Sequence, residues 1–237
     1  MNKRIVTFGE IMLRLSKPGF RRLQQGRAFE GNFGGSEANV AVSLACLGED
    51  VEYVSRVPCS AMGDAALMHL REYGVDVSHV VRGGERLGAY YFESAAAMRD
   101  SLVVYDRKDS AFYSLKQGMI DWGKTLDGAG LFHCSGITCA ISRDAMLTTM
   151  DAVREARERG LAVSCDINYR KNLWGYGLEA HDVLFQLATY SDIIFGDQNE
   201  WEVATGLRHI PFTATSAGYE IDRGAYEAYF ERASRLF

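Results

Sequence analysis

The stretch GNFGGSEANVAVSLACLG at residues 31–48 decides the fold. A strand-like segment leads into Gly34 and Gly35, and from Ser36 apolar residues recur at helical spacing until Gly48 ends the run. Two glycines between strand and helix let the backbone approach a ligand, and the helix N-terminus offers free N–H donors. Asn39, one turn into the helix, can donate to one hydroxyl group and accept from another. A plain glycine turn with Ser36 as helix cap explains the same residues.

Short β-rich runs alternate with amphipathic stretches along most of the remaining chain. Strands are expected at 4–8, 51–57, 131–135, 162–167 and 193–195, and helices at 37–47, 61–73, 144–159 and 181–190. Ser142 can cap the third of these helices and Gly160 can end it. This alternation predicts an α/β fold with a parallel sheet flanked by helices.

A second group of strand-like segments lacks helices between its members. These segments lie near 11–15, 28–34, 89–93 and 102–107. We expect them to form a small β-sheet lid over the carboxyl ends of the parallel strands, where α/β proteins bind ligands. Because the lid strands come from two distant places in the sequence, residues 1–237 are interpreted as a single domain.

Composition and targeting signals exclude several classes of protein. The chain has 26 Lys and Arg against 31 Asp and Glu, without the basic excess that nucleic-acid binding requires. No signal peptide is recognisable, and no run approaches the ~20 apolar residues of a membrane span. The five cysteines form no CxxC pair, which favours a reduced, cytoplasmic protein.

The GGSEANVA run resembles the first signature of the PfkB (ribokinase-like) carbohydrate kinases. The resemblance covers residues 4 to about 206, and YDRKDSA and DINYRKNLW are most similar to the 2-keto-3-deoxygluconate kinases. Its other segments follow in the family's order and approximate spacing: FGEIMLRLS (8–16), MGDAALMHLREYGVD (62–76), YDRKDSA (105–111), CSGIT (134–138), SCDINYRKNLW (164–174) and NEWEVATG (199–206). The resemblance implies a ribokinase-like fold and transfer of the ATP γ-phosphate to a sugar acid.

By this resemblance, the substrate-binding residues are Gly34, Gly35, Asn39, Tyr90, Tyr105, Arg107, Ile137 and Arg170. Arg170 would contact the carboxylate end of the sugar acid, while Tyr90, Tyr105 and Arg107 would close over it from the lid. Arginine suits this ligand because its planar guanidinium binds a carboxylate through two parallel hydrogen bonds. The alternatives are surface ion pairs for the arginines, ordinary edge-strand tyrosines, and a core position for Ile137.

Four polar residues complete the expected site. Asp166 and Asn168 follow a strand at the carboxyl edge of the sheet, where they are expected to support the site. By resemblance, Asn199 and Glu202 help to order Mg²⁺ and phosphate through water, in keeping with the preference of Mg²⁺ for oxygen ligands. A purely electrostatic role of Glu202 near a helix N-terminus is the alternative.

The family's second signature, a glycine-rich turn with the catalytic Asp and the anion hole, is not found in this sequence. LDGAG (126–130) is not that signature, because no Asp follows Gly130 and the next residues form a strand. The chain ends in GAYEAYFERASRLF (224–237), an apolar helical stripe without a stop signal. We therefore expect an N-terminal portion of a longer enzyme, with the catalytic base beyond Phe237 and the C-terminal part of the fold absent.

The predicted function is ATP- and Mg²⁺-dependent phosphorylation of 2-keto-3-deoxygluconate at its 6-hydroxyl, with this chain holding the substrate-binding part. Fructokinase or another PfkB sugar kinase is the alternative within the class. A non-catalytic sugar-acid-binding fragment is the alternative outside it, since the chain as given lacks the catalytic Asp. The unpaired edges of the lid sheet further predict a homo-oligomer formed through the lid.

Overall fold

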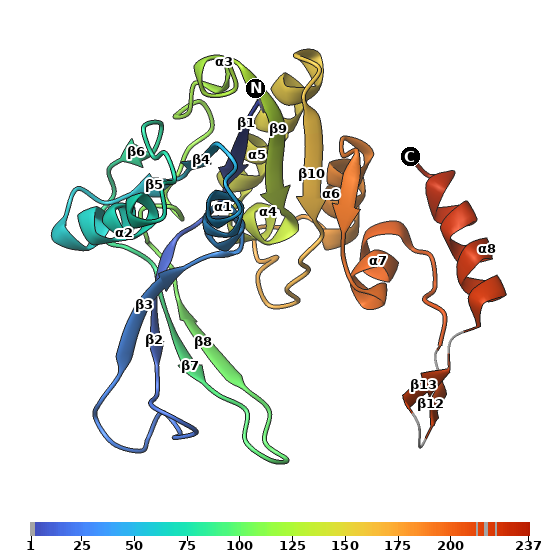
Figure 1. Cartoon of the computed structure of the whole chain (residues 1–237), viewed down its shortest axis with the longest axis horizontal. Coiled ribbons are helices and arrows are strands. Elements are labelled where there is room, and N and C mark those ends of the chain that lie inside the picture. The colour runs from blue at the N-terminus through green and yellow to red at the C-terminus, as the bar shows by residue number, and fades with distance from the viewer. Residues whose placement is uncertain (1–2, 212, 216–217, 221) are drawn as a thin grey trace.

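The computed structural model describes residues 3–211, 213–215, 218–220 and 222–237. Its centre is a parallel five-stranded sheet with the strand order β11-β10-β9-β1-β4 (Figure 1). The strands are β1 (Arg4–Phe8), β4 (Val51–Val54), β9 (Ala129–Ser135), β10 (Ala162–Asp166) and β11 (Ile193–Phe195). The parallel sheet confirms the fold class expected from the alternation of strand and helix patterns.

Helices pack on both faces of this sheet. In chain order the helices are α1 (Ser36–Cys46), α2 (Ala61–Glu72), α3 (Trp122–Thr125), α4 (Gly136–Ile141), α5 (Arg143–Glu158), α6 (Ala180–Thr189), α7 (Gln198–Thr205) and α8 (Arg223–Ser234). The last of them, α8, lies beyond α6 and α7, away from the sheet (Figure 1). Alternate strand residues such as Phe8, Phe132 and Val163 share one core with residues of α5, including Met150. A second core joins α1 and α2 to β4, where Tyr53 is fully buried.

Two helix starts show how local sequence sets the backbone. Ser142 caps α5 as expected, because its hydroxyl accepts a hydrogen bond from the Ala145 amide at 3.1 Å. The expected cap of α1 is wrong: Gly35 is the N-cap and Ser36 is already helical. Gly35 is required there by space, since a Cβ would lie 2.0 Å from the carbonyl oxygen of Glu10.

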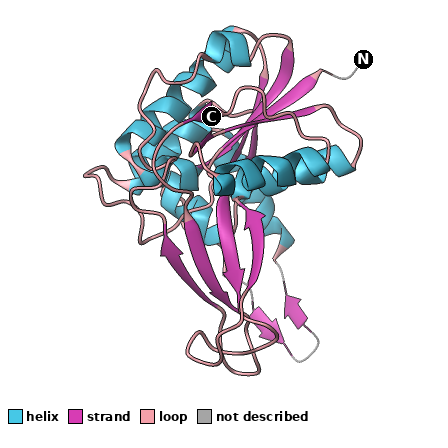
Figure 2. Ribbon diagram, turned by 90° about the vertical axis from the view of Figure 1, so that its left-hand side faces the viewer, coloured by secondary structure: helices cyan, strands magenta, loops and turns pink. Residues whose placement is uncertain are grey.

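A second, four-stranded sheet extends away from the parallel sheet (Figures 1 and 2). Its strand order is β3-β2-β7-β8, from β2 (Met12–Ser16), β3 (Glu30–Gly34), β7 (Ala89–Glu93) and β8 (Leu102–Asp106). The strand β2 pairs antiparallel with β3 but parallel with β7, which comes much later in the chain. The second sheet therefore contains the strand-like segments that were expected from two distant places in the sequence, β2 and β3 from one place and β7 and β8 from the other.

The remaining short strands are β5 (Arg56–Val57), β6 (Val81–Arg82), β12 (Thr213–Thr215) and β13 (Gly218–Glu220). β5 pairs with β6, and β12 pairs with β13. Within the described part of the chain, every helix is too short or too polar to cross a bilayer.

Candidate functional site

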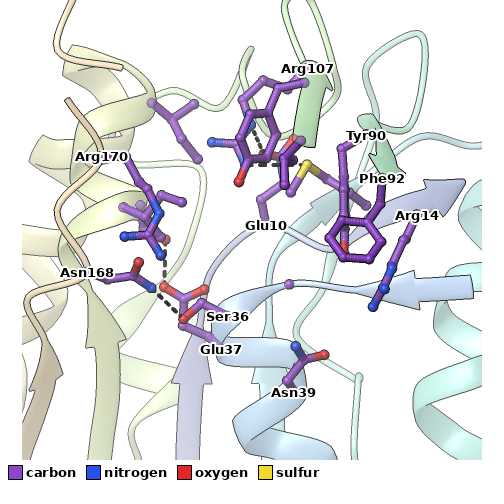
Figure 3. A pocket seen from close by; sticks show the side chains of 17 residues that line it. Glu10, Arg14, Ser36, Glu37, Asn39, Tyr90, Phe92, Arg107, Asn168 and Arg170 are labelled. Atoms are coloured by element: carbon purple, nitrogen blue, oxygen red, sulfur yellow. Dashed lines mark hydrogen bonds and ion pairs between the residues drawn. The ribbon is translucent and has the colours of Figure 1, made fainter. Parts of the chain in front are cut away.

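A cavity of about 340 Å³ lies where the second sheet meets the carboxyl ends of β1, β9 and β10. Figure 3 shows Arg170 and Asn168 on one side of it, and Tyr90, Phe92 and Arg14 on the opposite side. Eight of the residues expected at the site line this cavity: Gly35, Asn39, Tyr90, Tyr105, Arg107, Ile137, Asn168 and Arg170.

The second sheet turns one face toward the cavity. Successive side chains of a strand point to opposite faces, so alternate residues share this side. In β7 and β8, Tyr90 pairs with Tyr105 and Phe92 with Val103, and all four line the cavity. The Tyr90 and Tyr105 rings lie 5.9 Å apart between centroids. Their contact gives the cavity an apolar wall that also carries two phenolic hydroxyls.

The glycine turn before α1 forms the floor of the site. Gly34 does not line the cavity, but a Cβ there would lie 3.3 Å from the Asn39 side-chain oxygen and 3.7 Å from the Tyr90 hydroxyl. Ser36, freed from capping, accepts a hydrogen bond from the Asn168 amide nitrogen at 2.9 Å. Asn168 holds this position in a left-handed conformation, with φ of 40°. The turn after β10 is therefore tied directly to the start of α1.

Arg107 follows β8 and is only 7% exposed. Its Nε lies 3.2 Å from Oε2 of Glu10, and its guanidinium carbon lies 4.7 Å from the centre of the Tyr105 ring. Burial raises the pKa of the Glu10 carboxyl, and the nearby Arg107 charge opposes that rise. A surface ion pair, one of the interpretations that the sequence allowed, therefore does not describe Arg107.

Arg170 approaches the cavity from the loop after β10 and is much more exposed. Its side chain is 47% exposed, and Nη1 donates to the Tyr169 carbonyl at 2.8 Å and lies 3.4 Å from Oε1 of Glu200. This geometry fits the surface ion pair that the sequence allowed, and it also leaves the residue at the rim of the cavity. Of the two predicted arginines, one is therefore buried and the other is exposed.

Glu37 is the buried carboxylate beneath the glycine turn. It is 1% exposed and accepts hydrogen bonds from the Ser135 hydroxyl and, at 2.8 Å, from the Thr138 hydroxyl. Burial raises its pKa, and these two hydrogen bonds oppose the rise. Gly9 leaves room for it, because a Cβ at that position would lie 2.0 Å from Oε2 of Glu37. Glu37 thus links α1 to the end of β9 and the start of α4.

Three of the predicted residues lie away from this cavity. Asp166 lines a separate apolar cavity of about 490 Å³ and accepts a hydrogen bond from the Asn168 amide at 3.2 Å. Burial raises the pKa of Asp166, and the Glu200 carboxylate adds to the rise. Asp166 therefore lies next to the turn that carries Asn168, outside the lining of the candidate cavity.

Asn199 and Glu202 lie on α7, which begins with a capping box formed by Asp197 and Glu200. The Glu202 carboxylate accepts hydrogen bonds from the backbone and the ring of His209, and the hydrogen bond from the ring lowers its pKa most. Oxygen donors of this kind suit hydrated Mg²⁺, although Glu202 would have to exchange its His209 partner. Among the described residues, no three His, Cys, Asp or Glu side chains are grouped to hold a metal ion.

Several cavity residues were not predicted from the sequence to belong to the site. They are Glu10, Met12, Arg14, Ser36, Glu37, Phe92, Val103, Thr138 and Ile141. Two-residue periodicity could have found some of them, because Phe92 and Val103 each lie two positions from a predicted tyrosine. Arg14 adds a third guanidinium, which lies 4.3 Å from the centre of the Phe92 ring. No local pattern indicates that Glu10 would pair with Arg107.

Comparison with known proteins supplies the family. The model of the pfkB family of carbohydrate kinases matches residues 2–220. A 2-dehydro-3-deoxygalactonokinase of Haloferax volcanii is 34% identical over 200 residues, and a 2-dehydro-3-deoxygluconokinase of Bacillus subtilis is 31% identical over 202 residues. These matches cover 84% and 85% of this chain, respectively. The chain spans 62% of the length of each of these curated relatives.

A solved structure extends the likeness to three dimensions. The crystal structure of a 2-dehydro-3-deoxygluconokinase from Thermotoga maritima is 40% identical, with a TM-score of 0.90. That match covers 99% of this chain and 69% of the solved one. The family match, which spans most of the chain, and the shared architecture lead to one conclusion: this chain belongs to the pfkB family of carbohydrate kinases.

Proposed function

We propose that this chain forms the substrate-binding part of an ATP-dependent kinase for 2-keto-3-deoxygluconate, also called 2-dehydro-3-deoxygluconate. The observation that carries the proposal is that Arg107 and Arg170, from different parts of the chain, line one cavity that also contains hydroxyl-binding groups. A neutral sugar has no need of two guanidinium groups, whereas a keto acid offers a carboxylate and an adjacent keto oxygen.

Each side of the cavity has a separate role in this proposal. Arg170 binds the carboxylate end from the rim, where its exposed guanidinium is accessible to an entering ligand. Asn39 and Tyr90 hydrogen-bond to sugar hydroxyls, and Gly34 and Gly35 keep the backbone close enough for contact. The second sheet acts as a lid, whose Tyr105 and Arg107 close over the sugar acid.

Phosphoryl transfer needs an anion hole and a group that accepts the proton of the attacking 6-hydroxyl. The carboxylates that line the cavity are Glu10 and Glu37, and both are already bound to buried partners. We propose that the general base and the anion hole come from residues other than those that line this cavity, and that Asn199 and Glu202 help to order hydrated Mg²⁺ beside the ATP phosphates. When bound, Mg²⁺ would neutralise charge on those phosphates.

Isothermal titration of an Arg170→Ala variant tests the substrate assignment. Loss of a bidentate, charge-assisted contact should weaken binding of 2-keto-3-deoxygluconate roughly 10- to 100-fold. Binding of fructose, which has no carboxylate, should change less than about threefold. Arg154→Ala is the matched control, because Arg154 pairs with its helical neighbour Asp151 on the surface of α5. Equal losses for the acid and the neutral sugar would contradict the assignment.

The same titrations should include both C4 epimers of the acid, since the relatives compared above are named for the gluconate and the galactonate forms. An assay of ATP consumption by this chain separates a kinase from a sugar-acid-binding protein without turnover. We expect the chain to bind the acid but to hydrolyse or transfer ATP slowly. Turnover at ordinary kinase rates of about 1–100 s⁻¹ would contradict the expectation, drawn from the sequence, that the catalytic base lies beyond Phe237.

A further inference from the structure

The two edges of the Arg107 guanidinium have different surroundings. Nε lies 3.2 Å from Oε2 of Glu10, and Nη2 lies 3.3 Å from the Met12 sulfur. Nη1 and Nε are both buried and have no hydrogen-bond partner among the described residues, so Glu10 contacts Nε as an ion pair, whereas Nη1 has no such contact. A buried donor without a partner is costly, and here it belongs to a residue that lines the candidate substrate cavity. An acceptor on a ligand that reaches Nη1 would satisfy this donor.

Glu10 is itself held firmly in place. It is 4% exposed, and Oε1 accepts a hydrogen bond from the Ser110 hydroxyl at 2.9 Å. A Cβ on Gly88 would lie 2.6 Å from Oε1, and one on Gly35 would lie 2.0 Å from the Glu10 carbonyl oxygen. The carboxylate therefore fits between the end of β1 and the start of β7. Figure 3 shows it beside Arg107, at the end of the cavity away from Asn39.

We propose that Glu10 is a positioning residue, which holds Arg107 by its Nε edge so that Nη1 stays directed to the carboxylate or keto oxygen of the substrate. This inference rests on the proposed function, because it requires a ligand with an anionic or keto group. An arginine fixed before binding loses less side-chain entropy when the ligand arrives. The ion pair would therefore increase affinity for the acid without touching it.

Two variants of Glu10 separate the effect of its side-chain length from the effect of its charge. Glu10→Asp keeps the charge but shortens the side chain by one methylene, which moves the carboxylate away from Nε. Glu10→Gln keeps the reach and an oxygen acceptor but removes the charge. If Glu10 acts by positioning, Glu10→Asp should weaken binding of 2-keto-3-deoxygluconate about tenfold and Glu10→Gln less than about threefold, measured by isothermal titration. The reverse order would overturn the proposal.

A double-mutant cycle tests whether the effect passes through Arg107. Arg107→Lys keeps a positive charge beside Glu10 but loses the guanidinium fork. Adding Glu10→Asp to Arg107→Lys should then weaken acid binding by less than about twofold beyond Arg107→Lys alone. If Glu10→Asp and Arg107→Lys instead weaken acid binding independently, so that their factors multiply in the double variant, the proposal is overturned. Glu155→Asp, which shortens the acidic side chain of a surface ion pair with Arg159, serves as the matched control and should leave binding unchanged.

The outcomes also separate this inference from the proposed function. If Arg107→Lys does not weaken binding of the acid, the assigned role of Arg107 in the substrate site fails. If Arg107→Lys weakens binding while Glu10→Asp does not, the substrate site stands and the positioning role of Glu10 is overturned. Circular dichroism and thermal unfolding of each variant confirm that the compared proteins are folded.

Discussion

Arg107 and Arg170 reach the same cavity from very different surroundings. The Arg107 side chain is 7% exposed and pairs with the buried Glu10, whereas Arg170 is 47% exposed beside Glu200. Local sequence placed both arginines at or just after strands, which was enough to predict their position near the carboxyl edge of the sheet. The partner of Arg107 could not be predicted, because Glu10 comes from the distant loop between β1 and β2 and meets it only through tertiary packing.

This difference predicts separate effects on stability. Arg107→Ala leaves the Glu10 carboxylate buried without its partner, and should lower the free energy of unfolding by about 3–5 kcal/mol. Arg170→Ala removes an exposed ion pair and should change that free energy by less than about 1 kcal/mol. Urea unfolding followed by circular dichroism measures both values. Similar losses for the two variants would show that the Glu10–Arg107 pair is not buried as described.

His133 predicts how stability depends on pH. Burial lowers the pKa of its imidazole to about 4, from an ordinary value of 6.5. The neutral ring is favoured in the folded state, so its contribution is complete above pH 6.5 and is lost as pH falls toward 4. Relative to His133→Asn, the wild-type chain should lose about 3 kcal/mol between pH 7 and pH 4.

Urea unfolding of both proteins at several pH values measures this loss. Taking the difference between them cancels the contributions of carboxylates such as Glu37 and Asp166, whose raised pKa values act in the opposite direction. Parallel stability curves for the two proteins would contradict the burial of His133.

At the scale of elements, the start of α1 is set by the close approach of Gly35 to the Glu10 carbonyl oxygen and not by a side-chain cap. The sequence pattern predicted a strand, a glycine turn and a helix, and all three are present. It named Ser36 as the cap, but the contact between Gly35 and the Glu10 carbonyl oxygen moves the helix start and leaves the Ser36 hydroxyl to Asn168. That outcome depends on where β1 ends in space, which residues 31–48 do not encode.

Gly35→Ala tests the closeness of this packing. A Cβ would lie 2.0 Å from the Glu10 carbonyl oxygen, so α1 and β1 must separate. We expect a loss of about 1–3 kcal/mol in the free energy of unfolding, together with weaker binding of the sugar acid. Gly175→Ala is the control, because a Cβ there has no neighbour within 4 Å. Its effect should stay within about 0.5 kcal/mol, and equal effects of both substitutions would contradict the packing.

The strands of the second sheet were recognisable from the sequence, but their pairing was not. Alternation marks which side chains share a face, and it would have placed Phe92 beside Tyr90 and Val103 beside Tyr105. The parallel pairing of β2 with β7 joins segments separated by α1, α2 and several shorter elements. Residues such as Arg14 and Met12 therefore enter the site only once the tertiary register is known.

At the scale of the whole molecule, the second sheet offers a surface for self-association. The strand β8 forms one edge of it, and Leu102, Val103, Val104 and Tyr105 are each between 38% and 44% exposed. Val103 and Tyr105 line the cavity, which leaves Leu102 and Val104 on the opposite face. We propose that two copies of the chain associate through this sheet, since an unpaired apolar edge favours pairing.

Val104→Glu should therefore shift the chain toward the monomer, because it buries a charge in the proposed contact. Size-exclusion chromatography with light scattering measures the mass. Leu47→Glu, at the exposed end of α1 where Leu47 is 79% exposed, is the control and should leave the mass unchanged. A monomeric wild-type chain, or an unchanged mass for Val104→Glu, would contradict association through this sheet.

The central claim is that the cavity between the two sheets recognises a keto sugar acid. Its most direct test is isothermal titration of the 237-residue chain with 2-keto-3-deoxygluconate and with fructose under the same conditions. Two guanidinium groups at the cavity predict that the acid binds at least about tenfold more tightly than the neutral sugar, with one site per chain. Equal affinities, or tighter binding of fructose, would contradict the claim.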